Sequence, residues 1–102
     1  MQHTRVAIYQ FKPGTVGEAL AKAQAGLLPI YQAQPGFVGY GVVITENDGA
    51  VSISIWQTQE QAQAAVQTAA GWVAANVAEL VVSVQNLVGD LAFFSSAGTI
   101  GG

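Results

Sequence analysis

The sequence contains no cysteine and a single histidine. The missing thiols exclude disulfides, thiolate catalysis and sulfur-ligated metal sites. The one histidine, His3, lies in an N-terminal stretch that we expect to be frayed, with the imidazole in solvent. A three-ligand metal site and a Ser-His-Asp triad both need better-placed side chains than this. We therefore predict no metal site.

Charge is equally scarce. Charged residues make up 9% of the chain, against about 25% in an ordinary soluble domain, and glutamines occupy many of the remaining polar positions. The basic residues Arg5, Lys12 and Lys22 form no run or stripe in a chain of net charge −3, which argues against nucleic acid as a partner. A surface with so few charges favours burial of part of it against another protein molecule.

Long hydrophobic runs are also missing. No stretch reaches about 18 uninterrupted apolar residues, and the most apolar region, 62–82, is interrupted by Gln63, Gln67, Asn76 and Glu79. The first residues run straight into a strand pattern and lack the apolar segment and small-residue cleavage site of a signal peptide. We predict no membrane partner and a cytoplasmic location.

What the sequence does contain is a repeated strand–helix–strand pattern. Strands are predicted at 6–11, 37–45, 50–57 and 81–88, the last with a continuation to Phe94 left open. Helices are predicted between them, and their starts, Thr15–Glu18 and Thr58–Gln61, match the capping box. Glu46–Gly49 is predicted as a hairpin turn whose Asp48-Gly49 pair adopts positive φ angles.

The order β-α-β-β-α-β predicts a ferredoxin-like α+β domain, with an antiparallel four-stranded sheet and both helices on one face. The chain of 102 residues suits one such domain, which we place at residues 1–94. The small, glycine-rich segment 95–102 is predicted to be a flexible C-terminal tail.

The predicted strands are apolar on both faces, whereas a sheet covered on one face alternates apolar and polar residues. In the first strand Val6 and Ile8 oppose Ala7, Tyr9 and Phe11. The other opposed sets are Val38, Tyr40, Val42 and Ile44 against Phe37 and Val43, and Val82, Val84 and Val88 against Val81 and Leu87. Because the helices cover one face, a second copy of the chain is expected to cover the other, giving an isologous homodimer.

Three motifs, in their order and spacing, make the chain similar to a known family. They are Phe11-Lys12-Pro13-Gly14 after the first strand, Gln34-Pro35-Gly36-Phe37-Val38-Gly39 at the start of the second, and Val51-Ser52-Ile53-Ser54-Ile55-Trp56 before the second capping box. The chain resembles the antibiotic-biosynthesis-monooxygenase (ABM-type) family of dimeric α/β barrels from about Arg5 to Phe94. The resemblance implies a homodimer whose two sheets close into a shared barrel, with a cavity for a small apolar or aromatic ligand.

The family that the chain resembles is functionally mixed. Some members oxidise quinol-type substrates with molecular oxygen and no cofactor, and others degrade haem. The haem-degrading branch uses an Asn on the first strand and a Trp and a His on the second helix, and the matching positions here lie near Ala7, Ala65 and Ala75. The resemblance therefore argues against haem and implies no cofactor. The strand-end Trp of the cofactor-free oxygenases has its counterpart in Trp56.

The candidate substrate-binding residues are aromatic or carry small polar groups. They are Trp56, Trp72, Asn76, Tyr31, Ser52, Ser54 and Tyr40. Ser52, Ser54 and Trp56 share one face of their strand, and Trp72 and Asn76 lie four residues apart on one helix face. Each has a structural alternative, because the aromatic residues also suit an ordinary core and Asn76 also suits capping or contact with water.

Three functions remain open for such a protein. The first is a cofactor-independent monooxygenase of a small aromatic or quinol-type substrate, which needs a base or an anion stabiliser. The second is a non-catalytic binding protein for a small molecule, and the third is a structural dimer without a ligand. A cavity lined by at least two polar groups favours the first, and a closed interior with Trp56 fully packed favours the third.

Overall fold

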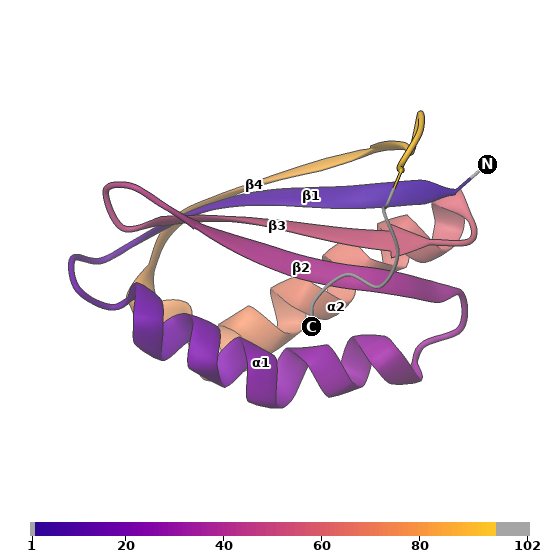
Figure 1. Cartoon of the computed structure of the whole chain (residues 1–102). Coiled ribbons are helices and arrows are strands. Elements are labelled where there is room, and N and C mark those ends of the chain that lie inside the picture. The colour runs from indigo at the N-terminus through magenta and orange to yellow at the C-terminus, as the bar shows by residue number, and fades with distance from the viewer. Residues whose placement is uncertain (1, 96–102) are drawn as a thin grey trace.

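The computed structural model describes residues 2–95 and confirms the ferredoxin-like order (Figure 1). The elements are β1 (His3–Phe11), α1 (Val16–Ala33), β2 (Phe37–Thr45), β3 (Gly49–Trp56), α2 (Gln59–Asn76), the 3₁₀ turn η1 (Ala78–Leu80) and β4 (Val81–Asp90). The strands form one antiparallel sheet in the order β2-β3-β1-β4, and both helices cover the same face (Figure 1). Residues 96–102 of the predicted tail lie outside the described residues.

The two predicted capping boxes have different outcomes. At α2 the box is confirmed, because the Gln61 backbone N–H donates to Thr58 Oγ1 at 3.2 Å and the Thr58 N–H donates to Gln61 Oε1 at 3.1 Å. At α1 the prediction is wrong. Thr15 Oγ1 donates to the Lys12 carbonyl at 2.8 Å and makes no bond to the first helical amides. The hydroxyl therefore stabilises the preceding turn instead of the helix start.

The predicted hairpin between β2 and β3 is present but centred one residue earlier. The residues with positive φ are Asn47 at 59° and Asp48 at 61°, and Gly49 is already the first residue of β3, paired with Thr45. Three residues, Glu46 to Asp48, therefore connect the paired Thr45 and Gly49, and positive φ at two of them allows this short reversal. Asp48 Oδ1 also accepts the Gly14 N–H at 3.0 Å, so the hairpin is tied to the turn that precedes α1.

A β-bulge changes which residues of β4 face the helices, compared with the sequence prediction. The register between β1 and β4 shifts between Gln10 and Phe11, and Phe11 pairs with Val81. Val84 pairs with Tyr9, so Val81 and Val84 share the helix-facing side and their predicted opposition is wrong. Strict alternation misses this because a bulge sets two residues of one strand opposite one of the other.

The first strand is longer than predicted. β1 begins at His3, which pairs across the sheet with Asp90, and His3 Nδ1 lies 2.6 Å from Asp90 Oδ1. The prediction of a frayed, solvated histidine is therefore wrong. The added residues also bring Arg5 into the sheet, where its side chain lies on the helix-facing side and reaches Tyr31 of α1.

Two groups of buried side chains hold the helices on the sheet. The larger group consists of Leu27, Tyr31, Trp56, Ala62, Ala65 and Ala69. The smaller consists of Phe11, Val16, Ala19 and Ala50. The alanines of α2 carry little volume, so the helix approaches the sheet closely without filling all of the space beneath it. No helix within residues 2–95 is long and apolar enough to cross a membrane.

The face of the sheet opposite the helices is apolar and uncovered in a single subunit. Two rows of paired residues cross it, Val43–Val51–Ile8 and Gly41–Ile53–Val6–Leu87. Val43 is 62% exposed and Ile53 is 40% exposed. Within the described strands this face carries no Asp, Glu, Lys or Arg. The two-sided apolar pattern of the sequence therefore corresponds to a real apolar surface.

Replacing Gly36 with alanine is expected to lower the free energy of unfolding by about 2 kcal/mol, because a residue with a Cβ is strained at positive φ and the α2 cap weakens. Gly36 has φ +80°, and an added Cβ would overlap the Gln61 carboxamide of the capping box. Gly71→Ala, at an exposed position of α2 with open space around it, is the matched control and should stabilise by about 0.5–1 kcal/mol. Urea unfolding of both variants measures this, and equal effects would contradict the assignment.

Candidate functional site

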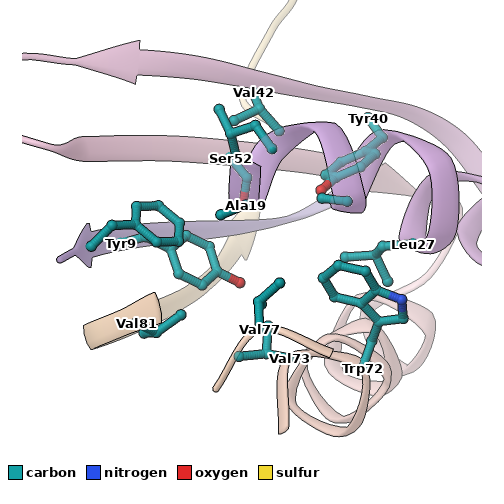
Figure 2. A pocket seen from close by; sticks show the side chains of 13 residues that line it. Tyr9, Ala19, Leu27, Tyr40, Val42, Ser52, Trp72, Val73, Val77 and Val81 are labelled. Atoms are coloured by element: carbon teal, nitrogen blue, oxygen red, sulfur yellow. The ribbon is translucent and has the colours of Figure 1, made fainter. Parts of the chain in front are cut away.

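Three cavities lie between the sheet and the helices. The central cavity has a volume of about 30 Å³ and is lined by residues including Tyr9, Leu27, Tyr40, Ser52, Trp72 and Val77 (Figure 2). The β2-side cavity, about 380 Å³, lies between α1 and β2 and includes Leu20, Gln24, Leu28, Tyr40 and Ile44. The β4-side cavity, about 290 Å³, lies between α2 and β4 and includes Arg5, Tyr9, Val73, Ala74, Val84 and Asn86.

Three of the candidate residues line the central cavity, and they come from different elements. Ser52 is buried on β3, Tyr40 projects from β2, and Trp72 reaches in from α2 (Figure 2). The Trp72 indole fits beside α1 because the residue opposite is Gly26. A Cβ added at Gly26 would lie 2.9 Å from the indole Nε1. The central volume of about 30 Å³ is enough for a water-sized molecule and is too small for an aromatic ring.

Trp56 and Ser54 are core residues and line none of the three cavities. Trp56 is 0% exposed and its Nε1 donates to Ser54 Oγ at 2.9 Å. Its ring contacts Tyr31 and Phe37 edge to face, with centroids 5.3 Å and 5.6 Å away. Trp56 and Ser54 therefore pack the core, as the structural alternative for these residues expects.

Asn76 and Tyr31 also lie outside the cavities. Asn76 is exposed at the end of α2, and its Nδ2 donates to the Trp72 carbonyl at 2.9 Å, so the amide caps its own helix. The four-residue spacing correctly places Asn76 near Trp72, but the Asn76 amide contacts the Trp72 backbone and not the indole ring. Tyr31 is fully buried and its hydroxyl donates to the Ala65 carbonyl at 3.2 Å.

Arg5 is the functional candidate that the sequence analysis missed. Its side chain is 2% exposed and borders the β4-side cavity. Nε and Nη2 both donate to Asn86 Oδ1, at 2.9 Å and 2.6 Å, and Nη2 also donates to the Tyr9 hydroxyl at 3.1 Å. Nη1 donates to the Tyr31 hydroxyl at 3.1 Å. These bonds fix the guanidinium among four elements, β1, β4, α1 and, through Ala65, α2.

The charge of Arg5 has no negative partner in the part of the chain that the structure describes. Within residues 2–95 the acidic side chains that contact a basic side chain are Asp90, beside His3, and Glu18, beside Lys22. Arginine keeps its charge in proteins, and a buried ion without a counter-charge costs several kcal/mol. Neutral hydroxyl and amide oxygens offset part of that cost. Arg5 therefore places one positive charge at the wall of the β4-side cavity.

Tyr9 connects this charge to the interior. It borders both the central and the β4-side cavities, and its hydroxyl oxygen accepts from Arg5. A phenol that accepts from a cation becomes a better donor, because the bond polarises its O–H. Within residues 2–95 no three His, Asp or Glu side chains gather to hold a metal ion. The arrangement can thus bind and stabilise an anionic oxygen through Tyr9 and Arg5.

Burial raises the pKa of Tyr40 to about 12, and the nearby Tyr31 and Tyr9 add to the rise while Arg5 opposes it. Burial likewise raises the pKa of Tyr31, with Arg5 opposing. Both groups are therefore neutral phenols at physiological pH and act as hydrogen-bond donors rather than as bases.

The raised pKa of Tyr40 predicts a loss of stability at alkaline pH. The phenol ionises near pH 10 in the unfolded chain but near 12 in the fold, so the free energy of unfolding is unaffected below pH 10 and falls between pH 10 and 12. Urea midpoints at pH 8 and 11.5 measure this. Tyr40→Phe should lose less stability than the wild type over that range, and an equal loss would contradict the assignment.

Comparisons with known proteins identify one family model and a shared fold. The family model for antibiotic biosynthesis monooxygenase matches residues 3–85. A protein of unknown function from Nitrosomonas europaea is similar in structure, with a TM-score of 0.75, 21% identity and 96% of each chain covered. A Chloroflexus aurantiacus protein provisionally named an antibiotic biosynthesis monooxygenase has a TM-score of 0.70 and 14% identity, covering 96% of this chain and 100% of that one. A conserved protein from Methanosarcina mazei has a TM-score of 0.71 and 15% identity, covering 88% of this chain and 92% of that one.

Identities this low establish the fold and leave the substrate open. A search of curated proteins finds no match.

Proposed function

Because the chain belongs to the antibiotic biosynthesis monooxygenase family, we propose that it is a cofactor-independent monooxygenase acting on a small aromatic or quinol-type substrate. The observation that carries this proposal is the β4-side cavity, where an apolar wall faces a buried guanidinium and the Tyr9 hydroxyl. A substrate that reacts with dioxygen without a cofactor does so as an electron-rich anion. Preorganised hydrogen-bond donors stabilise such an anion.

In this proposal the substrate ring packs against Val73, Ala74 and Val84, and its oxygen accepts from Tyr9. Arg5, 3.1 Å from the Tyr9 oxygen, strengthens that bond, while the substrate proton leaves to solvent. For an anthrone, the reactive methylene becomes a carbonyl. One atom of dioxygen stays on the carbon, and the other leaves as water, which takes the second methylene hydrogen and one proton returned from solvent. The substrate supplies all the electrons, so the reaction is balanced without a reductant.

The test is oxygen uptake by the purified protein with anthrone and with a hydroxylated naphthoquinol. We expect anthrone to be converted to anthraquinone with one dioxygen consumed per product and no added cofactor. Heat-denatured protein measures the spontaneous reaction. If the protein binds these compounds without accelerating oxygen uptake, the binding-protein alternative holds and the monooxygenase proposal fails.

We also propose that the active form is a homodimer, joined through the apolar sheet face. The support is the set of exposed apolar side chains on that face, Ile8, Val43, Ile53 and Leu87, together with its lack of charged groups. Sedimentation equilibrium of the wild type should give twice the chain mass of 10.5 kDa. Ile53→Lys should give monomers, because it buries an unpaired charge at the centre of the interface. A monomeric wild type would contradict the assembly.

A further inference from the structure

We propose that the β4-side cavity binds a carboxylate, and hence that the substrate is a hydroxylated aromatic carboxylic acid. Only the identification of this ligand as the substrate rests on the proposed function. The carboxylate-binding site itself follows from Arg5 and the groups around it. Arg5 is 2% exposed, borders a cavity and has no carboxylate partner within residues 2–95, which is the chemistry of a site completed by an anion.

The hydrogen bonds of the guanidinium leave room for this anion. Arginine has five N–H donors, and four are used, two to Asn86 and one each to Tyr9 and Tyr31. Within the described residues the fifth, on Nη1, has no acceptor. Asn86 presents its oxygen to Arg5, and among the described residues its Nδ2 has no acceptor. The residue is exposed at the cavity edge. Arginine and an amide together therefore offer a carboxylate several donors.

The remaining lining gives the shape of the ligand. Val73, Ala74, Val84 and the other apolar side chains cover the rest of the cavity, which favours a flat apolar body. The Tyr9 hydroxyl is bonded to the same Arg5 Nη2 at 3.1 Å. A ligand whose carboxylate meets Arg5 therefore has a ring hydroxyl near Tyr9 only when the two groups are adjacent on the ring. The preferred class is an ortho-hydroxy aromatic carboxylate.

The test compares two ligands of nearly the same shape, 1-hydroxy-2-naphthoate and its neutral amide, 1-hydroxy-2-naphthamide, in which an NH2 group replaces one charged acceptor oxygen. Calorimetric titrations under nitrogen measure binding without turnover. We expect the wild type to bind the carboxylate about tenfold more tightly, or better, than the amide. A wild type that binds both equally, or neither, overturns the proposal.

Two variants locate the preference. Arg5→Met removes the charge and should bring the ratio of the two dissociation constants close to one. Asn86→Asp replaces the amide whose Oδ1 already accepts from Arg5 Nε and Nη2 with a carboxylate. The new carboxylate should pair with Arg5 inside the protein, so the urea midpoint should stay the same or rise. The variant should nevertheless lose the preference for the carboxylate ligand over the amide. This second variant keeps the test decisive if Arg5→Met fails to fold.

Matched controls change the same charges elsewhere. Lys22→Met removes a cation from the exposed Lys22–Glu18 pair, and Gln63→Glu adds an anion at an exposed position of α2 that lies outside the cavity lining. Both should keep the wild-type preference, and full preference in Asn86→Asp would contradict the assignment to Arg5. Oxygen uptake is not part of this readout. Carboxylate preference without oxygenation would therefore overturn the proposed function alone, and oxygenation without the preference would overturn this inference alone.

Discussion

Replacing Trp56 with alanine is expected to lower the free energy of unfolding by about 3–5 kcal/mol. The side chain is 0% exposed and lies between the rings of Tyr31 and Phe37, where the surrounding groups have little freedom to close the gap. The loss combines the transfer of a large apolar side chain with the cost of the cavity left behind. Urea unfolding followed by circular dichroism measures it.

The control for this prediction is Trp56→Phe, which keeps most of the packing and removes the Nε1 bond to Ser54. It should cost less than the alanine variant, because the volume change is smaller. Since Trp56 borders none of the cavities, both variants should retain oxygenation per folded molecule at low temperature. A Trp56→Ala protein of normal stability and abolished activity would show instead that this residue serves the reaction.

Replacing Tyr9 with phenylalanine is expected to lower kcat for anthrone oxygenation about 100-fold, the usual effect of removing one preorganised donor to an oxyanion. The Tyr9 hydroxyl is the group that Arg5 polarises, at 3.1 Å, and it borders the β4-side cavity in which we place the substrate. Steady-state oxygen uptake measures kcat and KM separately. A fall in kcat with little change in KM is expected, because the bond forms with the developing anion.

Tyr40→Phe is the matched control for Tyr9→Phe. Tyr40 lines the central and β2-side cavities and lies outside the β4-side cavity, so the loss of its hydroxyl should leave kcat close to that of the wild type. If Tyr40→Phe is the slow variant and Tyr9→Phe is normal, the substrate lies on the β2 side of the sheet. That result would contradict the site proposed here.

The sequence predicted the fold well because its signals are local or repeated. Hydrophobic periodicity, the Pro35-Gly36 helix stop and the Thr58–Gln61 capping box each depend on a few neighbouring residues. The apolar character of both strand faces also followed from alternation alone. The bulge between β1 and β4 did not, because it depends on how two strands distant in the sequence pair.

The site was harder to predict because it depends on where β1 begins. With the strand started at Val6, Arg5 counts as an end residue, and its role as a buried cation is hidden. The signal was available, since Arg5 is the single arginine of the chain and alternates in phase with Ala7, Tyr9 and Phe11 on the helix-facing side. Asn76 failed for another reason, because helical spacing places a residue on a face but does not decide whether its amide turns back to the backbone.

The central claim is that this chain transfers one atom of dioxygen to an aromatic substrate without a cofactor. Anthrone oxidised by the purified protein under ¹⁸O-labelled dioxygen, with the product analysed by mass spectrometry, tests it most directly. We predict anthraquinone that carries one ¹⁸O atom, formed faster with the wild type than with Tyr9→Phe. Unlabelled anthraquinone, or labelled product formed at the same rate with both proteins, would contradict the claim.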